Sequence, residues 1–158
     1  MKTIVLGTDG SPGAGHATRE AVELARETGW PLRIVAAWSV SSLGLSAGPV
    51  MAPDFAAVAK EAAQAALDAA VGEAEGAGVG VITYLRHGEA AAELCNVAEL
   101  MGDTVIVVGS HGRGALGRAM LGSVSTKLVH SAPCPVLVVR GASAARAAAD
   151  HGVISTHA

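Results

Sequence analysis

The chain has 158 residues, enough for one domain with a sizeable core and too few for two ordinary domains. About half of the residues are apolar but only 3% are aromatic, so we expect a core of Ala, Val, Leu and Ile. Residues 1–103 carry a net charge of −7 and residues 104–158 one of +4. Because the chain has few basic and few aromatic residues, a small anion is favoured over a nucleic acid as its partner.

The first half of the chain alternates between strand and helix patterns. The short apolar run "TIVLG" predicts a strand over 3–7, followed by a loop and a helix over 15–28. The run "LRIVAAW" predicts a second strand over 32–38. A Gly/Ser/Pro-rich connection over 41–53 is long for a compact domain. An Ala-rich helix over 54–75 follows, and we expect its first residue, an aspartate, to cap it.

The same alternation continues in the second half. A strand over 81–85 precedes a helix over 88–101, and a strand over 104–108 follows directly. After a glycine-rich loop, we expect a helix over 124–132 and a last strand over 134–140. Strands that are apolar on both faces predict an α/β fold, a three-layer open sheet of five parallel strands with four helices covering both faces.

Two loops leave the carboxyl ends of predicted strands and carry unusual sequences, 8–15 ("TDGSPGAG") and 109–123 ("GSHGRGALGRAMLGS"). In an open parallel sheet, ligands bind beyond the carboxyl ends of the strands, where the strand order reverses. The two loops would lie side by side there if the first and fourth strands are neighbours.

The second of these loops holds five glycines and two arginines, but no acidic residue. It is not a Walker A loop, because no lysine stands in the required place after Gly114 or Gly122. Gly112, Gly114 and Gly117 have the spacing G-x-G-x-x-G of the dinucleotide-binding motif, but the acidic residue that this motif requires about twenty positions further on is missing. A loop that binds phosphate and a merely flexible loop remain as alternatives.

Gly109, Gly112, Gly122 and Ser123 have the spacing G-x2-G-x9-G-[ST]. In this motif the chain resembles the universal stress protein family, in its ATP-binding branch. The segments "GTDGS" after the first strand and "SAPCPVLVV" near the end of the chain resemble the same family. The resemblance covers nearly the whole chain, and its motifs occur in the family's order.

The resemblance implies a single nucleotide-binding domain over 1–140 and a C-terminal tail over 141–158, either a short helix or disordered. It implies a Rossmann-like fold, similar to the adenine nucleotide alpha hydrolases, with strand order 3-2-1-4-5. The apolar run "PVLVV" would then form a sheet edge with unpaired backbone groups. We therefore expect a homodimer through residues 136–139.

The residues of the motif are chemically suited to phosphate. Glycines at 109, 112 and 122 let backbone N–H groups approach phosphate oxygens with no Cβ in the way. We also expect Gly122 to have a positive φ, which glycine commonly adopts. Ser123 and Ser125 begin the last helix, where the free N–H groups and the helix dipole favour an anion and where both hydroxyls can add hydrogen bonds to it, although Ser125 could also be an ordinary first-turn residue.

Some polar side chains in or near this loop could contact a ligand or have an ordinary surface role. Arg113, Arg118 and Lys127 supply a positive field, although each arginine could equally be a solvated surface charge. His111 lies between two motif glycines and could touch phosphate or be an ordinary loop residue. Trp38, at the end of the second strand, could stack on a ligand or belong to the core or to a dimer surface.

The resemblance assigns further contacts. Asp9 would meet the ribose or a metal near the phosphates, although Asp before Gly also suits a plain turn. Thr8 would lie beside the adenosine, and the backbone of Ala37 would contact the adenine. Val108 would face the nucleotide, and Val124 belongs to the first turn of the last helix.

The resemblance implies ATP, or AMP or ADP, as ligand, with Mg²⁺ or Mn²⁺ at the phosphates. The expected function is a stress-response or regulatory module with slow or no hydrolysis, so we assign no catalytic residue. The alternative is an enzyme that hydrolyses ATP or uses an adenylate. Phosphoryl transfer needs charge neutralisation and a positioned nucleophile, but the loop lacks the P-loop lysine.

The sequence also indicates the cellular location of the protein. No run is apolar for long enough to span a membrane, and the start of the chain does not have the pattern of a secretion signal. Cys95 and Cys134 are too few for a disulfide framework and lack the spacing of a metal site. We expect a cytoplasmic protein with both thiols reduced and with no membrane or nucleic-acid partner.

Overall fold

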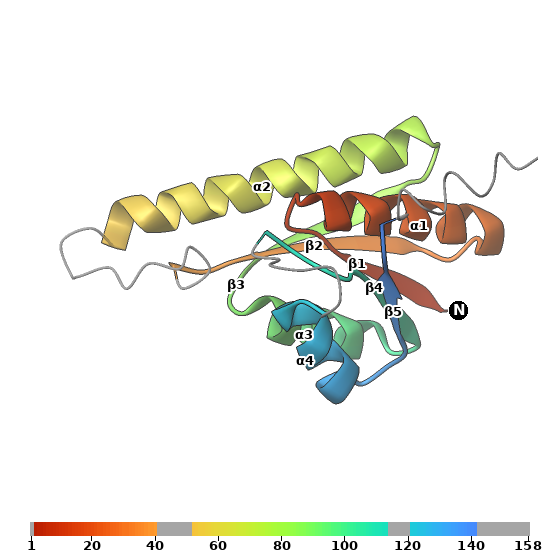
Figure 1. The fold of residues 1–158 in the computed structure, drawn as a ribbon. Coiled ribbons are helices and arrows are strands. Elements are labelled where there is room, and N and C mark those ends of the chain that lie inside the picture. The colour runs from red at the N-terminus through yellow and green to blue at the C-terminus, as the bar shows by residue number, and fades with distance from the viewer. Residues whose placement is uncertain (1, 41–51, 114–120, 142–158) are drawn as a thin grey trace, which may run out of the picture.

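A computed structural model describes residues 2–40, 52–113 and 121–141, with residues 52–54 described by their backbone alone (Figure 1). The long connection after the second strand, the middle of the glycine-rich loop and most of the C-terminal tail lie outside the described residues. The elements alternate along the chain: β1 (Thr3–Gly7), α1 (Pro12–Thr28), β2 (Leu32–Trp38), α2 (Ala52–Gly76), β3 (Val81–His87), α3 (Ala90–Met101), β4 (Thr104–Gly109), α4 (Ser123–Ser131) and β5 (Val136–Val139).

The five strands form one parallel sheet in the order β3-β2-β1-β4-β5. Helices α1 and α2 cover one face, and α3 and α4 cover the other (Figure 1). The predicted fold class and strand order are confirmed. The central strand β1 pairs with β2 on one side and with β4 on the other, Ile4 lying opposite both Leu32 and Val105.

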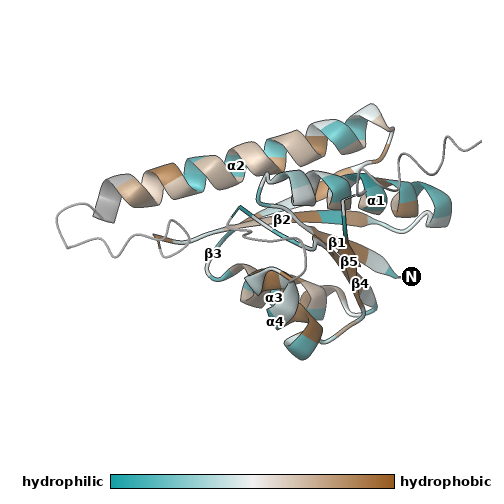
Figure 2. Ribbon diagram, viewed as in Figure 1, coloured by the Kyte–Doolittle hydropathy of each residue, from teal (hydrophilic) through white to brown (hydrophobic). Residues whose placement is uncertain are grey.

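Each face of the sheet has its own aliphatic core, and the apolar strands lie between the helix layers (Figure 2). Ile4 and Leu6 of β1 point toward α1 and α2, whereas Val5 points toward α3 and α4. This alternation follows from the two-residue period of a strand. No aromatic side chain among the described residues is fully buried, so the aliphatic core expected from the composition is confirmed.

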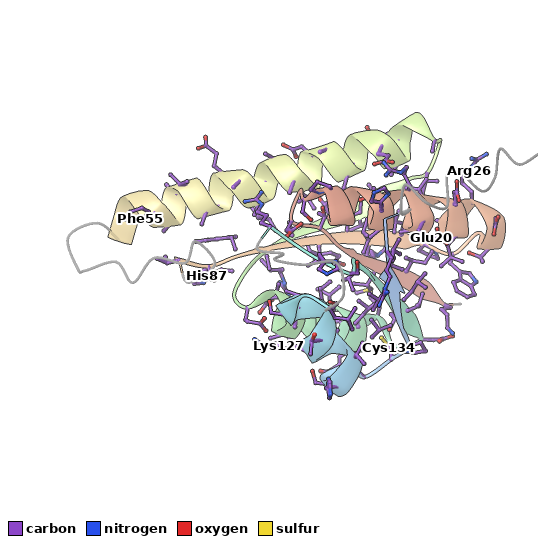
Figure 3. The ribbon with its side chains drawn as sticks, in the orientation of Figure 1. Glu20, Arg26, Phe55, His87, Lys127 and Cys134 are labelled. Atoms are coloured by element: carbon purple, nitrogen blue, oxygen red, sulfur yellow. The ribbon has the colours of Figure 1, made fainter. Side chains whose placement is uncertain are left out.

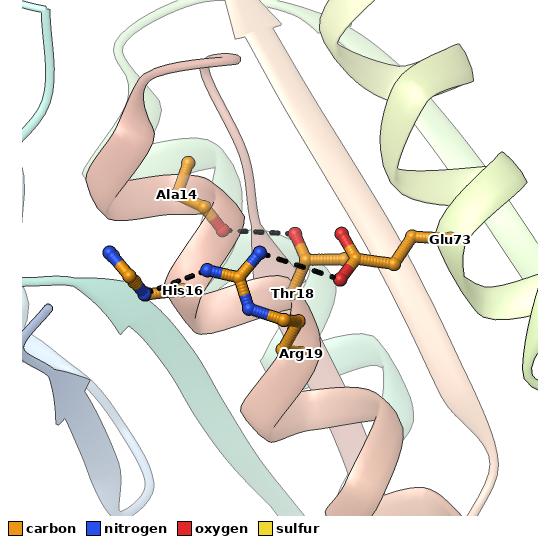
Figure 4. A network of polar contacts seen from close by, with 5 residues as sticks. All are labelled: Ala14, His16, Thr18, Arg19 and Glu73. Atoms are coloured by element: carbon orange, nitrogen blue, oxygen red, sulfur yellow. Dashed lines mark hydrogen bonds and ion pairs between the residues drawn. The ribbon is translucent and has the colours of Figure 1, made fainter. Parts of the chain in front are cut away.

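The alanines of α2 let this long helix lie close to its neighbours. Its buried side chains are mostly alanine: Ala59, Ala63, Ala66, Ala70 and Ala74, with Leu67 among them. An exposed ion pair between Arg19 of α1 and Glu73 of α2, 3.8 Å between Nη1 and Oε1, joins the two helices at the surface (Figure 4). Because a surface ion pair contributes little, burial of the alanine face is what fixes this contact.

Several element boundaries differ from the predicted ones. Helix α1 begins at Pro12, three residues earlier than expected, because the Ser11 hydroxyl accepts a hydrogen bond from the Ala14 N–H and proline suits the first helical position. Helix α2 begins at Ala52, so Asp54 lies inside the helix and is not its cap.

In the second half, β3 continues to His87 because its pairing with β2 extends to Trp38. Helix α3 then begins at Ala90, where the carboxylate of Glu89 accepts a hydrogen bond from the Ala92 N–H and caps the helix. Strand β5 covers only Val136–Val139, because prolines flank Cys134 and cannot donate to the ladder.

The end of β4 lies unusually close to the first turn of α1. A Cβ on Gly109 would lie 2.6 Å from the carbonyl carbon and oxygen of Gly13, and 3.0 Å from the Ala14 nitrogen. A Cβ on Gly13 would in turn collide with the carbonyl oxygen of His111. Two glycines, one on each segment, therefore permit this backbone-to-backbone contact.

Alanine substitution at Gly109, which lies in this contact, and at Gly15, which does not, should change the free energy of unfolding in opposite directions. Gly109→Ala should lower the free energy of unfolding by roughly 1–3 kcal/mol, because the clash is with backbone that cannot move aside cheaply. Gly15→Ala, in α1 with nothing within 4 Å of the added Cβ, should raise it by about 0.5–1 kcal/mol. Urea unfolding measures both values. Equal effects of the two substitutions would contradict the proposed constraint.

Candidate functional site

The two loops singled out in the sequence lie next to each other at one edge of the sheet. Loop 8–11 leaves β1 and loop 110–122 leaves β4, and these strands are neighbours. The chain continues from β1 through α1 to β2 on one side of β1, whereas β4 and β5 lie on its other side. The strand order therefore reverses between these loops, which is where open α/β sheets bind ligands.

The N-terminus of α4 faces this edge and is held by the loop after β4. The Gly122 N–H donates to the Ser110 carbonyl at 2.7 Å, and the Ser125 hydroxyl donates to the same carbonyl at 3.2 Å. The Thr126 N–H makes a helical hydrogen bond to the Gly122 carbonyl. The N–H groups of the preceding residues in the first turn have no intrahelical acceptor by their position, so this helix end can bind an anion.

The buried hydroxyl of Ser125 differs from the expectation that it faces a ligand. Ser125 is 2% exposed, and its hydroxyl braces the loop by contacting two backbone carbonyls, those of Ser110 and Gly122. Ser123 is exposed at the start of the helix. Of the two serines, Ser123 is thus the one whose hydroxyl is open to a ligand.

Asp9 joins the two loops through its carboxylate. Its Oδ1 accepts the Ser11 N–H at 2.9 Å, and its Oδ2 accepts the Arg113 N–H at 3.1 Å. The Arg113 Nε returns a hydrogen bond of 2.7 Å to the Asp9 carbonyl. A Cβ on Gly112 would lie 2.6 Å from Asp9 Oδ2, so glycine at this position gives the carboxylate its space. Asp9 is thus a turn former and also a link between the loops.

The cations near the loop are partly engaged within the protein. Arg113 binds Asp9 as described, and Lys127 on α4, labelled in Figure 3, forms an ion pair with Glu89, 3.3 Å between Nζ and Oε1. Arg118 lies outside the described residues. Lys127, paired with Glu89, therefore contributes a weaker positive field than expected. The Arg113 guanidinium donates to a neutral carbonyl and keeps its charge, and the backbone N–H groups at the start of α4 add further positive potential.

The other predicted contacts lie around the same edge. Thr8 is buried, and its N–H donates to the Val35 carbonyl. Ala37 is half-buried one residue before the end of β2. Val108 is 4% exposed and packs in the core under α3 and α4, so only its backbone is available to a ligand. Val124 is half-buried in the first turn of α4.

Trp38 is half-buried at the end of β2. It packs against the cluster under α1 and α2, and its ring centroid lies 4.4 Å from that of His87. His87 marks the exposed end of β3 (Figure 3).

The motif glycines are required for close approach and not for an unusual backbone conformation. Gly122 has φ −65° and ψ 165°, so the expected positive φ was wrong. A Cβ on Gly122 would lie 3.3 Å from the Ser110 carbonyl oxygen, tighter than ordinary contact. A positive φ occurs instead in the first loop, at Gly10.

Two serines of the site were not identified from the sequence. Ser11 caps α1, and its hydroxyl lies 3.5 Å from the His111 carbonyl oxygen across the two loops. Its position directly before Pro12 is the signal of a helix N-terminus and could have been recognised. Ser110 is buried and supplies the carbonyl that holds α4. No sequence signal marks that role, because the contact uses the backbone.

The described part of the chain contains no group of three or more His, Cys, Asp or Glu side chains arranged to hold a metal ion. Cys95 and Cys134 are free thiols, both half-buried, and burial raises the pKa of the Cys95 thiol. None of the helices that the structure describes has the length and apolarity needed to cross a membrane.

Residues 1–140 match the model of the universal stress protein family. The universal stress protein YxiE of Bacillus subtilis is 36% identical over 145 residues, which cover 87% of this chain and 97% of YxiE. The universal stress protein MJ0531 of Methanocaldococcus jannaschii is 34% identical over 140 residues, covering 88% and 82%.

A crystal structure of a universal stress protein in complex with cAMP has a TM-score of 0.65 to this chain at 27% identity, covering 87% of this chain and 96% of that one. The family match over most of the sequence agrees with the sheet order and with the glycine-rich loop at the strand-order reversal. The chain belongs to the universal stress protein family.

Proposed function

We propose that this chain binds an adenine nucleotide, ATP foremost, at the loops after β1 and β4, and that it acts as a stress-response regulatory module with slow or no hydrolysis. The observation that carries the proposal is the placement of Gly109, Gly112 and Gly122 around the open N-terminus of α4, at the strand-order reversal. The cAMP complex of a universal stress protein 27% identical to this chain supports an adenine ligand.

The phosphates would lie at the first turn of α4 and along the backbone of the motif glycines. The adenosine would extend toward the ends of β1 and β2, past Thr8 to Ala37. The proposed contact residues are Thr8, Asp9, Ala37, Val108, Gly109, Gly112, Arg113, Gly122, Ser123, Val124 and Ser125. For Val108 and Ser125 the contact would come from the backbone, since both side chains are buried.

Mg²⁺ or Mn²⁺ would accompany the phosphates. Asp9 fits one position in such a coordination shell, because its carboxylate lies between the two loops and hard cations prefer oxygen ligands. Phosphate oxygens and water would fill the other positions. The metal supplies charge neutralisation for the phosphates, and Asp9 would give up a backbone hydrogen bond to reach it.

The described site favours binding over catalysis. Its hydrogen-bond donors are mainly backbone N–H groups, and Lys127, the lysine nearest to the loop in sequence, is paired with Glu89. An ATPase or an adenylate-using enzyme would need a positioned nucleophile as well as charge neutralisation. The free thiols of Cys95 and Cys134 fit a reducing compartment, and we place the protein in the cytoplasm.

The phosphate assignment predicts that Gly122→Val weakens ATP binding. The first Cβ already lies close to the Ser110 carbonyl, and the methyl groups of valine would push the start of α4 away from the loop. ATP affinity should fall at least about tenfold, equivalent to about 1.4 kcal/mol. Calorimetry measures it, and far-UV circular dichroism checks that the fold is kept. Lys127→Ala, which removes an exposed charge, is the control and should change affinity much less.

The base assignment predicts that GTP binds far more weakly than ATP, because the proposed adenine contact is the backbone of Ala37, whose small side chain suits a flat adenine ring. Affinity for ATP should also fall when EDTA removes Mg²⁺ or Mn²⁺. Calorimetric titration of both nucleotides, with and without metal, measures these differences. Equal affinities for ATP and GTP would exclude the adenine assignment.

The regulatory assignment predicts slow turnover. Phosphate release from ATP should be far below the rates of order 1–10³ per second that are typical of enzymes. A coupled phosphate assay on protein freed of contaminating ATPases measures the rate. Turnover of several per second would favour the enzyme alternative.

We further propose a homodimer through the free edge of β5. The Pro135 and Val139 carbonyls accept hydrogen bonds from β4, so the two-residue period of the strand turns the backbone groups of Val136 and Val138 to the outer edge. Leu137, 37% exposed, adds an apolar side chain to this strand. Outward backbone groups at the edge of a sheet can pair with a second copy around a two-fold axis.

Val138→Pro tests the dimer because it removes an outward N–H and keeps the backbone hydrogen bonds between β5 and β4. Light scattering should show a shift toward monomer at a concentration where the wild type is dimeric. Leu137→Pro, which removes a ladder N–H, is the comparison and should instead destabilise the fold. A wild type that is monomeric at micromolar concentration would refute the dimer.

A further inference from the structure

His111 has a buried ring nitrogen that nothing in the described part of the chain satisfies. Its Nε2 is buried and has no hydrogen-bond partner there, whereas its Nδ1 lies 2.9 Å from the Ser110 hydroxyl. Arg33 Nε is also buried without a hydrogen-bond partner, but it lies on β2, outside the motif, and the buried Arg86 Nε forms an ion pair with Glu93. A buried nitrogen without a partner costs free energy, so its persistence requires an explanation.

The backbone of His111 is held in place from two sides. Its carbonyl oxygen lies 3.5 Å from the Ser11 hydroxyl, and it touches Gly13 so closely that a Cβ there would collide with it. On the other side, a Cβ on Gly122 would lie 3.4 Å from the His111 Cα. His111 is therefore fixed between the first turns of α1 and α4.

The contact with Ser110 determines whether Nε2 is a hydrogen-bond donor or acceptor. A neutral imidazole has one donor and one acceptor nitrogen. If the Ser110 hydroxyl donates to Nδ1, then Nε2 carries the proton and needs an acceptor. A phosphate oxygen is such an acceptor, and the N-terminus of α4, where Gly122 lies next to the His111 Cα, favours an anion in this part of the site.

We propose that His111 is a further phosphate contact of the nucleotide site, donating a hydrogen bond from Nε2 to a phosphate oxygen. This inference rests on the proposed function and adds to it a side-chain donor among backbone donors. It assigns Ser110 a positioning role, because the hydroxyl sets which ring nitrogen carries the proton.

Two amide substitutions separate a phosphate contact from a structural role. In His111→Gln the side-chain amide reaches the place of Nε2, whereas in His111→Asn it reaches only the place of Nδ1. His111→Asn should therefore weaken ATP binding by about tenfold, the effect of losing one hydrogen bond to a charged group, and leave adenosine binding unchanged. His111→Gln should bind ATP nearly as the wild type does. The reverse order, with Asn tolerated and Gln weak, would show that only the Ser110 contact matters and would overturn the inference.

A second measurement distinguishes this inference from the proposed function. In protein with ¹⁵N-labelled histidine, the Nε2 resonance of His111 should move when tripolyphosphate is added and should move similarly with ATP. Movement with tripolyphosphate but no binding of ATP would refute the adenine proposal and keep the His111 contact. Tight ATP binding with an unmoved Nε2 resonance would overturn the His111 contact alone. No response to either ligand would overturn both.

Discussion

The structure depends on the close contact between the end of β4 and the first turn of α1. Backbone meets backbone there, with Gly109 against Gly13 and the His111 carbonyl against the same turn. Because β4 and β1 are neighbours in the sheet, this contact brings the loops that follow them together at the strand-order reversal. The Asp9 carboxylate then fits where Gly112 leaves space, and Arg113 closes the link between the loops. The glycines of the motif thus first assemble the site, before any ligand is considered.

This arrangement changes the explanation of the basic loop. The sequence suggests attraction by arginine and lysine side chains, but Arg113 is bound to Asp9 and Lys127 to Glu89. What remains open is the first turn of α4, whose N–H groups point out of the helix. Backbone donors of fixed geometry select an anion by shape as well as by charge, whereas exposed side chains attract any anion weakly. We therefore expect a specific phosphate site and not a general anion-binding surface.

The fold could be predicted from the sequence because its signals are periodic and local. Short aliphatic runs alternate with amphipathic segments, and the family resemblance supplied the strand order, which periodicity alone does not determine. The motif glycines were found by their spacing, but the reason for glycine at 122 was not, since φ depends on tertiary packing. The roles of Ser110 and of the Ser125 hydroxyl were beyond sequence reasoning for the same cause. The Ser110 carbonyl accepts hydrogen bonds from the Gly122 N–H and from the Ser125 hydroxyl, and these partners come together only when the chain folds.

An amide NMR titration with ATP and Mg²⁺ tests most directly whether phosphate binds at the junction of the two loops. If the phosphates bind at the junction of the two loops, the amide resonances of Arg113, Ser123 and Val124 should shift saturably and more than those elsewhere. A shallow depression at the opposite, amino end of the strands, lined by residues that include Trp30 and Val79, provides the contrast. Shifts confined to that depression, or no saturable shift at the start of α4, would contradict the account.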